Sequence, residues 1–287
     1  MIQPETLSIV VGTNACNCSC PYCVSKMTFS ENKPEIEEVN WRNFSKALEF
    51  AKTSGVSTVL LTGKGEPTLY PQLITRYLKE IKKYKFPFVE LQTNGVELVK
   101  NDIQIGQLLN DWWHLGLTTI GVSCVHFSWL KNKEIFGENY PDLPFLIQRL
   151  HEDKFMIRLC CMLLNGHICQ VSDVNELLKF CLEHEVDQLT IRPIAVPDKS
   201  ENEDIYRWTE EHKLQNGSWT NIQKHIETYG KLLLELGYGA KVFDMNGQNI
   251  CLSNCLTEPI GERIRQLILH PNGRLNFSWQ YKGAVLL

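Results

Sequence analysis

The chain has 287 residues, of which 43% are hydrophobic and 22% charged, and its formal net charge at pH 7 is −4. This composition is that of an ordinary globular protein, with room for one large α/β domain or one and a half small ones. The negative net charge argues against extended nucleic-acid binding, but not against a nucleotide held by a local basic patch. No apolar run approaches the roughly 18 residues that span a bilayer, so we expect no membrane segment.

The first residues, Met1 to Thr6, include neither a basic region nor an apolar stretch and do not resemble a secretory signal peptide. We therefore expect a cytoplasmic protein whose eleven cysteines lie in a reducing environment. In such an environment, clustered cysteines indicate metal binding or catalysis more often than disulfides.

Strand-like and helix-like segments alternate over the first two-thirds of the chain. The expected strands span residues 6–12, 56–61, 88–92, 118–124, 155–164 and 188–194. The expected helices span residues 41–54, with Asn40 as the N-cap, and 71–84, 102–115, 141–153 and 171–184. This order predicts parallel βαβ units with right-handed connections. Val59 to Leu61, and Ile157 to Leu164 apart from Arg158, are continuously apolar, as strands buried on both faces are.

The polar stretch 197–218 is the best candidate for a domain boundary. We expect residues 1–196 to form the main unit and residues 197–287 to form a small C-terminal extension that caps it. Within the extension, residues 219–236 predict a long helix. Asn272-Gly273 between two alternating runs predicts a β-hairpin.

Three cysteines follow the first expected strand directly. Cys16, Cys20 and Cys23 form a C-x3-C-x2-C triplet, with the aromatic Tyr22 before the last cysteine. Three thiolates on one short loop can hold three irons of a [4Fe–4S] cluster and leave the fourth iron open, whereas ferredoxin cysteines cap every iron. The alternatives are a zinc-binding loop and a group of buried thiols. Cys18 competes with Cys16 for the first ligand position, and the three-residue gap to Cys20 favours Cys16.

The triplet resembles the cluster loop of the radical S-adenosylmethionine (radical SAM) superfamily, whose fourth iron binds the amino and carboxylate groups of S-adenosylmethionine (SAM). A second motif, Gly63-Lys64-Gly65-Glu66-Pro67, follows the second expected strand. It resembles the Gly-Gly-Glu-Pro stretch that binds the SAM amino group in that family, with Lys64 in a position usually held by glycine. Taken alone, this motif also fits an ordinary β-turn.

The resemblance covers roughly residues 6–195 and implies a partial (β/α)6 TIM-like barrel. It also implies one [4Fe–4S] cluster on Cys16, Cys20 and Cys23, with SAM as the second cofactor. Reduction by an external one-electron donor, such as flavodoxin or ferredoxin, would cleave SAM to a 5′-deoxyadenosyl radical. That radical would abstract hydrogen from a small-molecule, nucleotide or peptide substrate. The site must exclude water and stray reactants, because a primary carbon radical would otherwise react indiscriminately.

Four further polar residues lie in or after expected strands, at the edge where barrel folds place their active sites. We predict that Asn94, Ser123, Arg158 and Arg192 contribute to the cofactor site. The alternatives are a turn residue for Asn94 and a buried, hydrogen-bonded side chain for Ser123. Both arginines lie in apolar runs and need anionic partners. The SAM carboxylate or a structural Asp or Glu could serve Arg158, and a substrate carboxylate or phosphate could serve Arg192.

Cys251 and Cys255 in the extension are candidates for donating a hydrogen atom to a product radical. A second cluster is the alternative role for this pair, although such a cluster needs three or four ligands. The sequence thus predicts a radical SAM enzyme of unknown reaction type. The other hypotheses are an activating protein that installs a glycyl radical on a partner enzyme, and a zinc- or cluster-dependent binding module. The extension favours the first, because an activator needs an exposed docking surface rather than a capped pocket.

Overall fold

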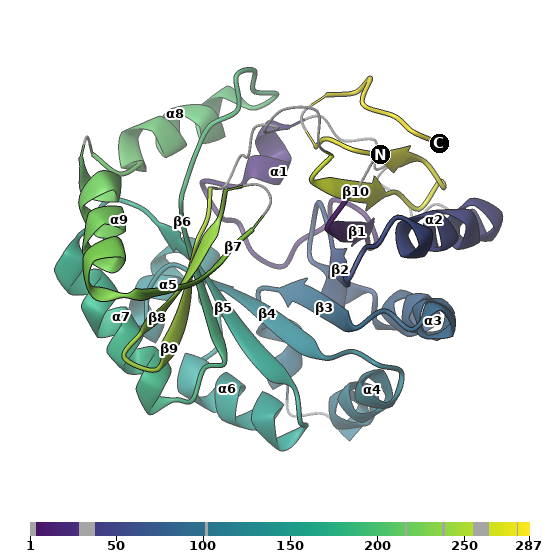
Figure 1. Ribbon diagram of the computed structural model, residues 1–287, viewed down its shortest axis with the longest axis horizontal. Coiled ribbons are helices and arrows are strands. Elements are labelled where there is room, and N and C mark those ends of the chain that lie inside the picture. The colour runs from purple at the N-terminus through teal and green to yellow at the C-terminus, as the bar shows by residue number, and fades with distance from the viewer. Residues whose placement is uncertain are drawn as a thin grey trace.

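The computed structural model describes residues 4–28, 38–100, 103–215, 217–236, 239–254, 264–279 and 281–287. These residues form one curved sheet of eleven strands in the order β11-β10-β1-β2-β3-β4-β5-β6-β9-β8-β7, with helices on its outer face (Figure 1). The strands are β1 (Thr6–Val10), β2 (Thr58–Thr62), β3 (Phe88–Thr93), β4 (Thr119–Cys124), β5 (Met156–Leu163), β6 (Gln188–Pro193), β7 (Lys231–Glu235), β8 (Lys241–Met245), β9 (Gln248–Leu252), β10 (Gln266–Leu269) and β11 (Leu275–Asn276).

The helices are α1 (Val24–Met27), α2 (Trp41–Thr53), α3 (Pro71–Ile81), α4 (Ile103–His114), α5 (Trp129–Phe136), α6 (Leu143–Glu152), α7 (Val171–Glu183), α8 (Glu203–His212) and α9 (Ser218–Tyr229). Short 3-10 turns cover Pro67–Leu69, Lys82–Tyr84 and Val96–Val99. The five helices and six strands predicted for the first two-thirds of the chain are all present, within a few residues of their predicted ends. Helices α1, α5 and α8 have no counterpart in the sequence prediction.

Helix α2 illustrates why the periodic segments fold as predicted. Its buried face repeats at helical spacing through Phe44, Ala47, Leu48 and Ala51, and the side chain of Asn40 accepts the backbone N–H of Asn43 at 3.1 Å. This apolar face belongs to the hydrophobic core on the outer side of the sheet.

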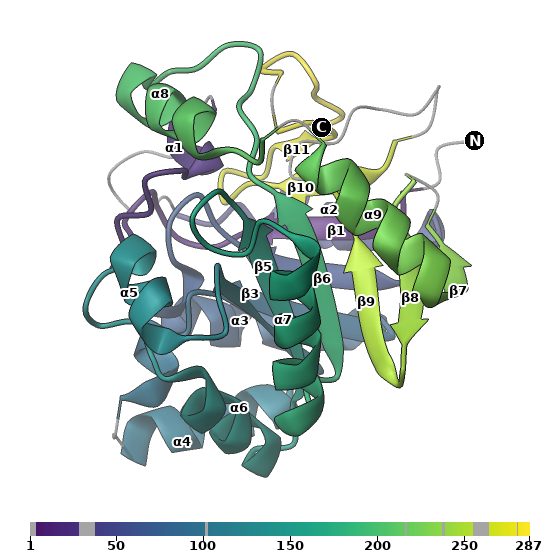
Figure 2. The same ribbon diagram turned by 90° about the vertical axis from the view of Figure 1, so that its left-hand side faces the viewer.

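Eight neighbouring strands run parallel, from β10 through β1–β6 to β9. Antiparallel strands complete both ends of the sheet, with β11 beside β10, and β8 and β7 beyond β9. Figure 2 shows β9, β8 and β7 continuing the sheet beyond β6, with α9 alongside them. The arrangement confirms the predicted α/β class and the partial TIM-like barrel.

The barrel strands alternate in polarity, in contrast to the continuous burial expected for β2 and β5. Leu7 and Ile9 of β1 are buried against the helices, whereas Thr6 and Ser8 point to the inside. By the same alternation, Leu60 of β2 and Arg158 of β5 lie on the inner face. The inner face lines a cavity instead of packing against a second apolar layer, and this leaves room for polar residues there.

The extension differs from its prediction in one element. The long helix predicted over residues 219–236 is wrong, because α9 ends at Tyr229 and strand β7 follows. Gly230 makes this turn possible, since a Cβ there would lie 2.7 Å from both the carbonyl oxygen of Ile226 and the sulfur of Met245. Three consecutive leucines in β7 fit either a helix or a strand, so periodicity could not separate the two.

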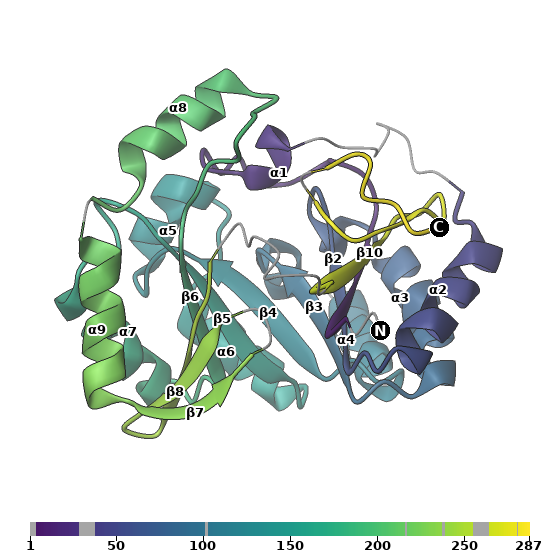
Figure 3. The ribbon, with the colours of Figure 1, turned by 45° about the horizontal axis from the view of Figure 1, so that its top comes forward.

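The predicted hairpin near Asn272-Gly273 is confirmed as β10–β11, and Gly273 has the positive φ of 85° that the turn needs. The extension also joins the barrel sheet at both ends, through β10 on β1 and β9 on β6. Helix α8 lies near α1, where the backbone N–H of Glu201 donates to the carbonyl of Met27 at 2.9 Å (Figure 3). None of the helices in the described ranges combines the length and the apolar character that a membrane crossing requires.

We expect Ile250→Ala in β9 to lower the free energy of unfolding of the whole barrel by about 2–4 kcal/mol, because Ile250 is fully buried where the extension joins β6. Urea unfolding followed by tryptophan fluorescence and by circular dichroism should show one shifted transition. Leu233→Ala on the exposed strand β7 is the matched control and should change little. A separate early transition confined to the extension would contradict this expectation.

Candidate functional site

The cysteine loop, residues 11–23, leaves the C-terminal end of β1 and lies over the ends of β2 and β3. The backbone N–H of Val11 donates to the carbonyl of Thr62 at 2.7 Å and prolongs the β1–β2 pairing. Further along the loop, the carbonyl of Ala15 accepts the backbone N–H of Glu66 at 2.9 Å. These two bonds fix the loop on the segment that follows β2.

Two glycines allow this close approach. A Cβ on Gly65 would lie 2.0 Å from the carbonyl oxygen of Ala15, which no side chain can occupy. A Cβ on Gly63 would lie 3.1 Å and 3.2 Å from the carbonyl oxygens of Gly65 and Val11. The backbone of the Gly-Lys-Gly-Glu motif therefore packs directly against the cysteine loop.

Glu66 joins the ends of β2 and β3. Its side chain is buried, and Oε1 accepts from the Thr68 N–H (3.0 Å) and from the hydroxyls of Thr68 and Thr93 (both 2.6 Å). Oε2 accepts the backbone N–H of Asn94 at 2.9 Å. Burial raises the pKa of Glu66, and these hydrogen bonds offset part of that effect. Oε2 keeps acceptor capacity for a cationic amine.

Asn94 connects the end of β3 to the cysteine loop. Its Nδ2 donates to Oδ1 of Asn17 at 2.7 Å and lies 3.9 Å from Sγ of Cys16. Its Oδ1 accepts the backbone N–H of Val96 at 3.0 Å, and Glu97 in turn accepts from Asn17 at 2.9 Å. The Asn94 side chain thus stabilises the turn after β3 and also contacts the cysteine loop.

The four cysteines of the loop differ in position. Cys16 is exposed, Cys20 and Cys23 are partly buried, and Cys18 belongs to the hydrophobic core. Hydrogen bonds from the thiol and from the backbone N–H of Cys18 lower the pKa of Cys16 to about 7. The hydrogen bond with Cys16 and burial raise the pKa of Cys18, and burial raises the pKa of Cys20 to about 12. Cys16 is therefore exposed, whereas Cys18 is buried and donates hydrogen bonds to the Cys16 sulfur.

In the described ranges, no three His, Cys, Asp or Glu side chains converge on the position of a single metal ion. A [4Fe–4S] cluster distributes its cysteine ligands over separate irons, so its ligands need not converge on one point.

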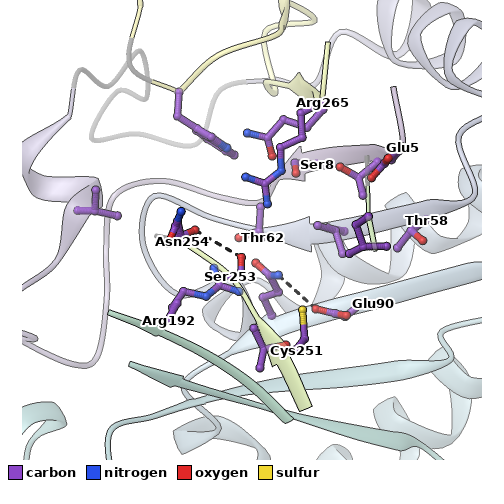
Figure 4. Close-up of a pocket in the computed structure, with 18 of the residues that line it drawn as sticks. Glu5, Ser8, Thr58, Thr62, Glu90, Arg192, Cys251, Ser253, Asn254 and Arg265 are labelled. Carbon is purple, nitrogen blue, oxygen red and sulfur yellow. Dashed lines mark hydrogen bonds between the residues drawn. The ribbon is translucent and has the colours of Figure 1, made fainter. Parts of the chain in front are cut away.

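A cavity of about 1090 Å³ lies inside the barrel next to the loop (Figure 4). Val24, Ser25 and Thr28, which follow Cys23, form part of its wall. Inward residues of β1, β2, β3, β5, β6 and β9 form another part of it: Thr6, Ser8, Thr58, Leu60, Thr62, Glu90, Gln92, Arg158, Gln188, Thr190, Arg192, Asn249 and Cys251.

Residues 10–142 match the model of the radical SAM superfamily. Over these residues the chain belongs to the radical SAM superfamily. No curated protein matches the sequence. The cysteine triplet and the Gly63–Glu66 motif both lie within the matched radical SAM segment.

Solved structures share the fold of this radical SAM protein. SuiB from Streptococcus suis, bound to S-adenosylmethionine, aligns with a TM-score of 0.63 and 17% identity over 98% of this chain and 61% of SuiB. SuiB bound to the precursor peptide SuiA aligns with a TM-score of 0.57 and 16% identity, over 96% of this chain and 59% of SuiB. Methylornithine synthase (PylB) aligns with a TM-score of 0.51 and 11% identity, over 69% of this chain and 56% of PylB. This chain therefore spans about three-fifths of the length of SuiB, and at these identities the likeness shows the fold alone.

Lys64, at the position where the radical SAM motif usually has glycine, is buried at the cavity wall. Its Nζ donates to Oγ1 of Thr28 at 2.7 Å and lies 5.6 Å from the ring centre of Trp279 in the extension. Burial lowers the pKa of Lys64 to about 8. Lys64 thus links the residues after the cysteine loop to the C-terminal tail.

Arg158 forms an ion pair inside the barrel with Glu90 of β3, a residue that the sequence reasoning missed. Gln92 also donates to Glu90, at 3.2 Å. Gly121 of β4 leaves the space for this carboxylate, since a Cβ there would lie 2.8 Å from its Oε1. The structural partner considered for Arg158 is therefore the one present, and a contact of Arg158 with SAM stays a prediction. The sequence signal that could have identified Glu90 is the alternation of Glu90 and Gln92 with apolar residues in this strand.

The remaining predicted residues occupy different places. Arg192 and Cys251 line the cavity. Ser123, at the end of β4, does not line it in the described structure, and its backbone carbonyl accepts from the hydroxyl of Tyr140 at 2.7 Å. Cys255 lies outside the described residues.

We expect Gly65→Ala to displace the cysteine loop, because its Cβ would overlap the Ala15 carbonyl. Iron bound per chain after anaerobic reconstitution should fall by half or more, given that no small shift relieves such an overlap. Gly106→Ala, in helix α4 with no atom within 4 Å of the added Cβ, is the control and should bind normal iron. Equal iron content in the two variants would show that the contact does not position the loop.

We expect Glu90→Gln to lower the free energy of unfolding by about 3 kcal/mol, because it leaves the buried Arg158 without its counter-charge. Adding Arg158→Met to Glu90→Gln should recover most of that loss. Urea denaturation of the three proteins measures both effects. A Glu90→Gln protein within about 0.5 kcal/mol of the parent would mean that the pair is solvated and structurally unimportant.

Proposed function

We propose that this protein is a radical SAM enzyme that abstracts hydrogen from a substrate enclosed in its barrel cavity. The observation that carries the proposal is the fixed position of the cysteine loop, bound to the Gly63–Glu66 motif and to Asn94 beside the cavity. Three thiols of different exposure on one loop, with N–H donors near Cys16, form a donor set that fits a [4Fe–4S] cluster.

When bound, the cluster and SAM together supply a 5′-deoxyadenosyl radical, after reduction by an external donor such as flavodoxin or ferredoxin. Cys16, Cys20 and Cys23 would hold the cluster. The backbone N–H of Cys18 and the amide of Asn94 would stabilise negative charge on the Cys16 sulfur. Oε2 of Glu66 would accept the SAM amino group, since the other carboxylate oxygen is already occupied by three donors.

The extension supplies the closure that radical chemistry requires. Residues 195–198 and the tail residues Phe277, Ser278, Trp279 and Tyr281 form part of the cavity wall. We propose residues 1–196 as the radical SAM unit and residues 197–287 as the segment that covers its mouth. A cavity with these residues in its wall supports a substrate held inside the barrel rather than a glycyl radical partner docked on an open surface.

Small molecules, nucleotides and peptides remain the substrate classes under this proposal. SuiB has been solved with a precursor peptide, which supports including peptides among them. We place the enzyme in the cytoplasm. Cys251 at the cavity wall stays a candidate hydrogen-atom donor to a product radical.

We expect Cys20→Ala to abolish the formation of 5′-deoxyadenosine from SAM under dithionite, because one cluster ligand is lost. Cys181→Ala is the matched control, since Cys181 is a fully buried thiol of α7 far along the chain from the loop. It should retain SAM cleavage and lose roughly 1 kcal/mol of stability. Chromatographic quantification of 5′-deoxyadenosine decides the matter. Unchanged cleavage by Cys20→Ala, or none by the fully reconstituted parent, would refute the proposed function.

A further inference from the structure

Arg192, near the C-terminal end of β6, carries a charge that the described parts of the chain do not neutralise. It lines the cavity, its Nε is buried without a hydrogen-bond partner, and none of the ion pairs there includes it. Arg158 on the neighbouring strand differs, because Glu90 compensates its charge. An uncompensated guanidinium in a protein interior is costly, so this position calls for an anion.

The surroundings of Arg192 offer further donors, and no carboxylate of the described residues forms an ion pair with it. The backbone N–H of Ser253 donates to the carbonyl of Ile191 at 3.1 Å, which places Ser253 beside Arg192 at the end of β9 (Figure 4). The Ser253 hydroxyl has only a long contact of 3.5 Å, to the carbonyl of Asn254. Cys160 and Cys251 lie within electrostatic reach of Arg192, and burial raises the pKa of both thiols, so they do not supply a negative charge.

We propose that Arg192 and the Ser253 hydroxyl form a subsite for a carboxylate group of the substrate; only the assignment to substrate rests on the proposed function. The planar guanidinium matches a carboxylate with two parallel N–H···O bonds. The single positive charge of Arg192 also matches a singly charged carboxylate better than a doubly charged phosphate.

Arg192 lies on a different strand from the segments that are expected to hold SAM. In the resembled family, the SAM carboxylate binds the open iron beside the cysteine loop. The cysteine loop follows β1, whereas Arg192 lies on β6, with β2 to β5 between them in the sheet. We assign the carboxylate at Arg192 to a second molecule, and the measurement with saturating SAM tests this assignment.

Alkylation of Cys251 tests the subsite without knowledge of the substrate. Cys251 and Arg192 are diagonal neighbours on adjacent strands, both facing the cavity. The probes are iodoacetate, which carries a carboxylate, and the neutral iodoacetamide, with site-resolved mass spectrometry of the anaerobic, reconstituted protein. The ratio of the two rates cancels any change in the reactivity of the Cys251 thiol itself.

We expect Arg192→Gln to lower the iodoacetate-to-iodoacetamide ratio at Cys251 about tenfold, the loss of one charge-assisted contact. Arg149→Gln on the outer helix α6 is the matched control and should leave that ratio unchanged. The ratio at Cys169, before α7, should be the same in all proteins. In the parent protein, propionate should slow the iodoacetate reaction, and the isosteric propionamide should not.

An unchanged ratio in Arg192→Gln, or no labelling of Cys251 by either reagent, would overturn the proposal. Stronger competition by inorganic phosphate than by propionate would overturn its choice of a carboxylate. Saturating SAM should leave the preference intact, and its loss would assign Arg192 to SAM instead. Alkylation needs no SAM cleavage, so a protein that fails to form 5′-deoxyadenosine but keeps the preference would refute only the proposed function.

Discussion

The hydrogen bonds of the Glu66 carboxylate hold the candidate site together. One buried carboxylate accepts four hydrogen bonds from Thr68, Thr93 and Asn94, and it thereby joins the end of β2 to the end of β3. The backbone of the same residue donates to Ala15 of the cysteine loop. The segments after β1, β2 and β3 are thus fixed to one another before any cofactor binds, and such preorganisation is what a reactive site needs.

A second constraint is the polarity of the barrel interior. The outer faces of the strands pack against helices and supply the hydrophobic core, which leaves the inner faces free for polar residues around the cavity. Inside, the Glu90–Arg158 pair neutralises one arginine, whereas Arg192 lacks such a partner among the described residues. The hydrophobic core between the strands and the helices therefore stabilises the fold, while the inside of the barrel is available for binding and chemistry.

Much of this architecture could be predicted from the sequence, because local patterns determine it. Helix α2 follows from its apolar spacing and the Asn40 cap, and the cysteine triplet pointed to the radical SAM superfamily through its resemblance to that family's cluster loop. The pairing of Arg158 with Glu90 could not be found in this way, since the two residues are 68 positions apart and meet only through strand order. Strand β7 escaped prediction because three successive leucines satisfy either periodicity.

The attachment of β9 and β10 to opposite ends of the barrel sheet was also beyond local patterns, since it depends on which strand edges remain free after the barrel forms. In the sequence, Thr6 and Ser8 alternate with apolar residues, and so do Glu90 and Gln92. This alternation did indicate a polar inner face. That signal was outweighed by the expectation that parallel strands are buried on both faces.

The central claim is that three cysteines hold a cluster with one iron open to SAM. Electron paramagnetic resonance of the dithionite-reduced protein, recorded with and without SAM, tests it most directly. The account predicts a [4Fe–4S] signal whose g-values shift when SAM is added, because SAM becomes a ligand of the open iron. A signal that is identical with and without SAM would contradict the account.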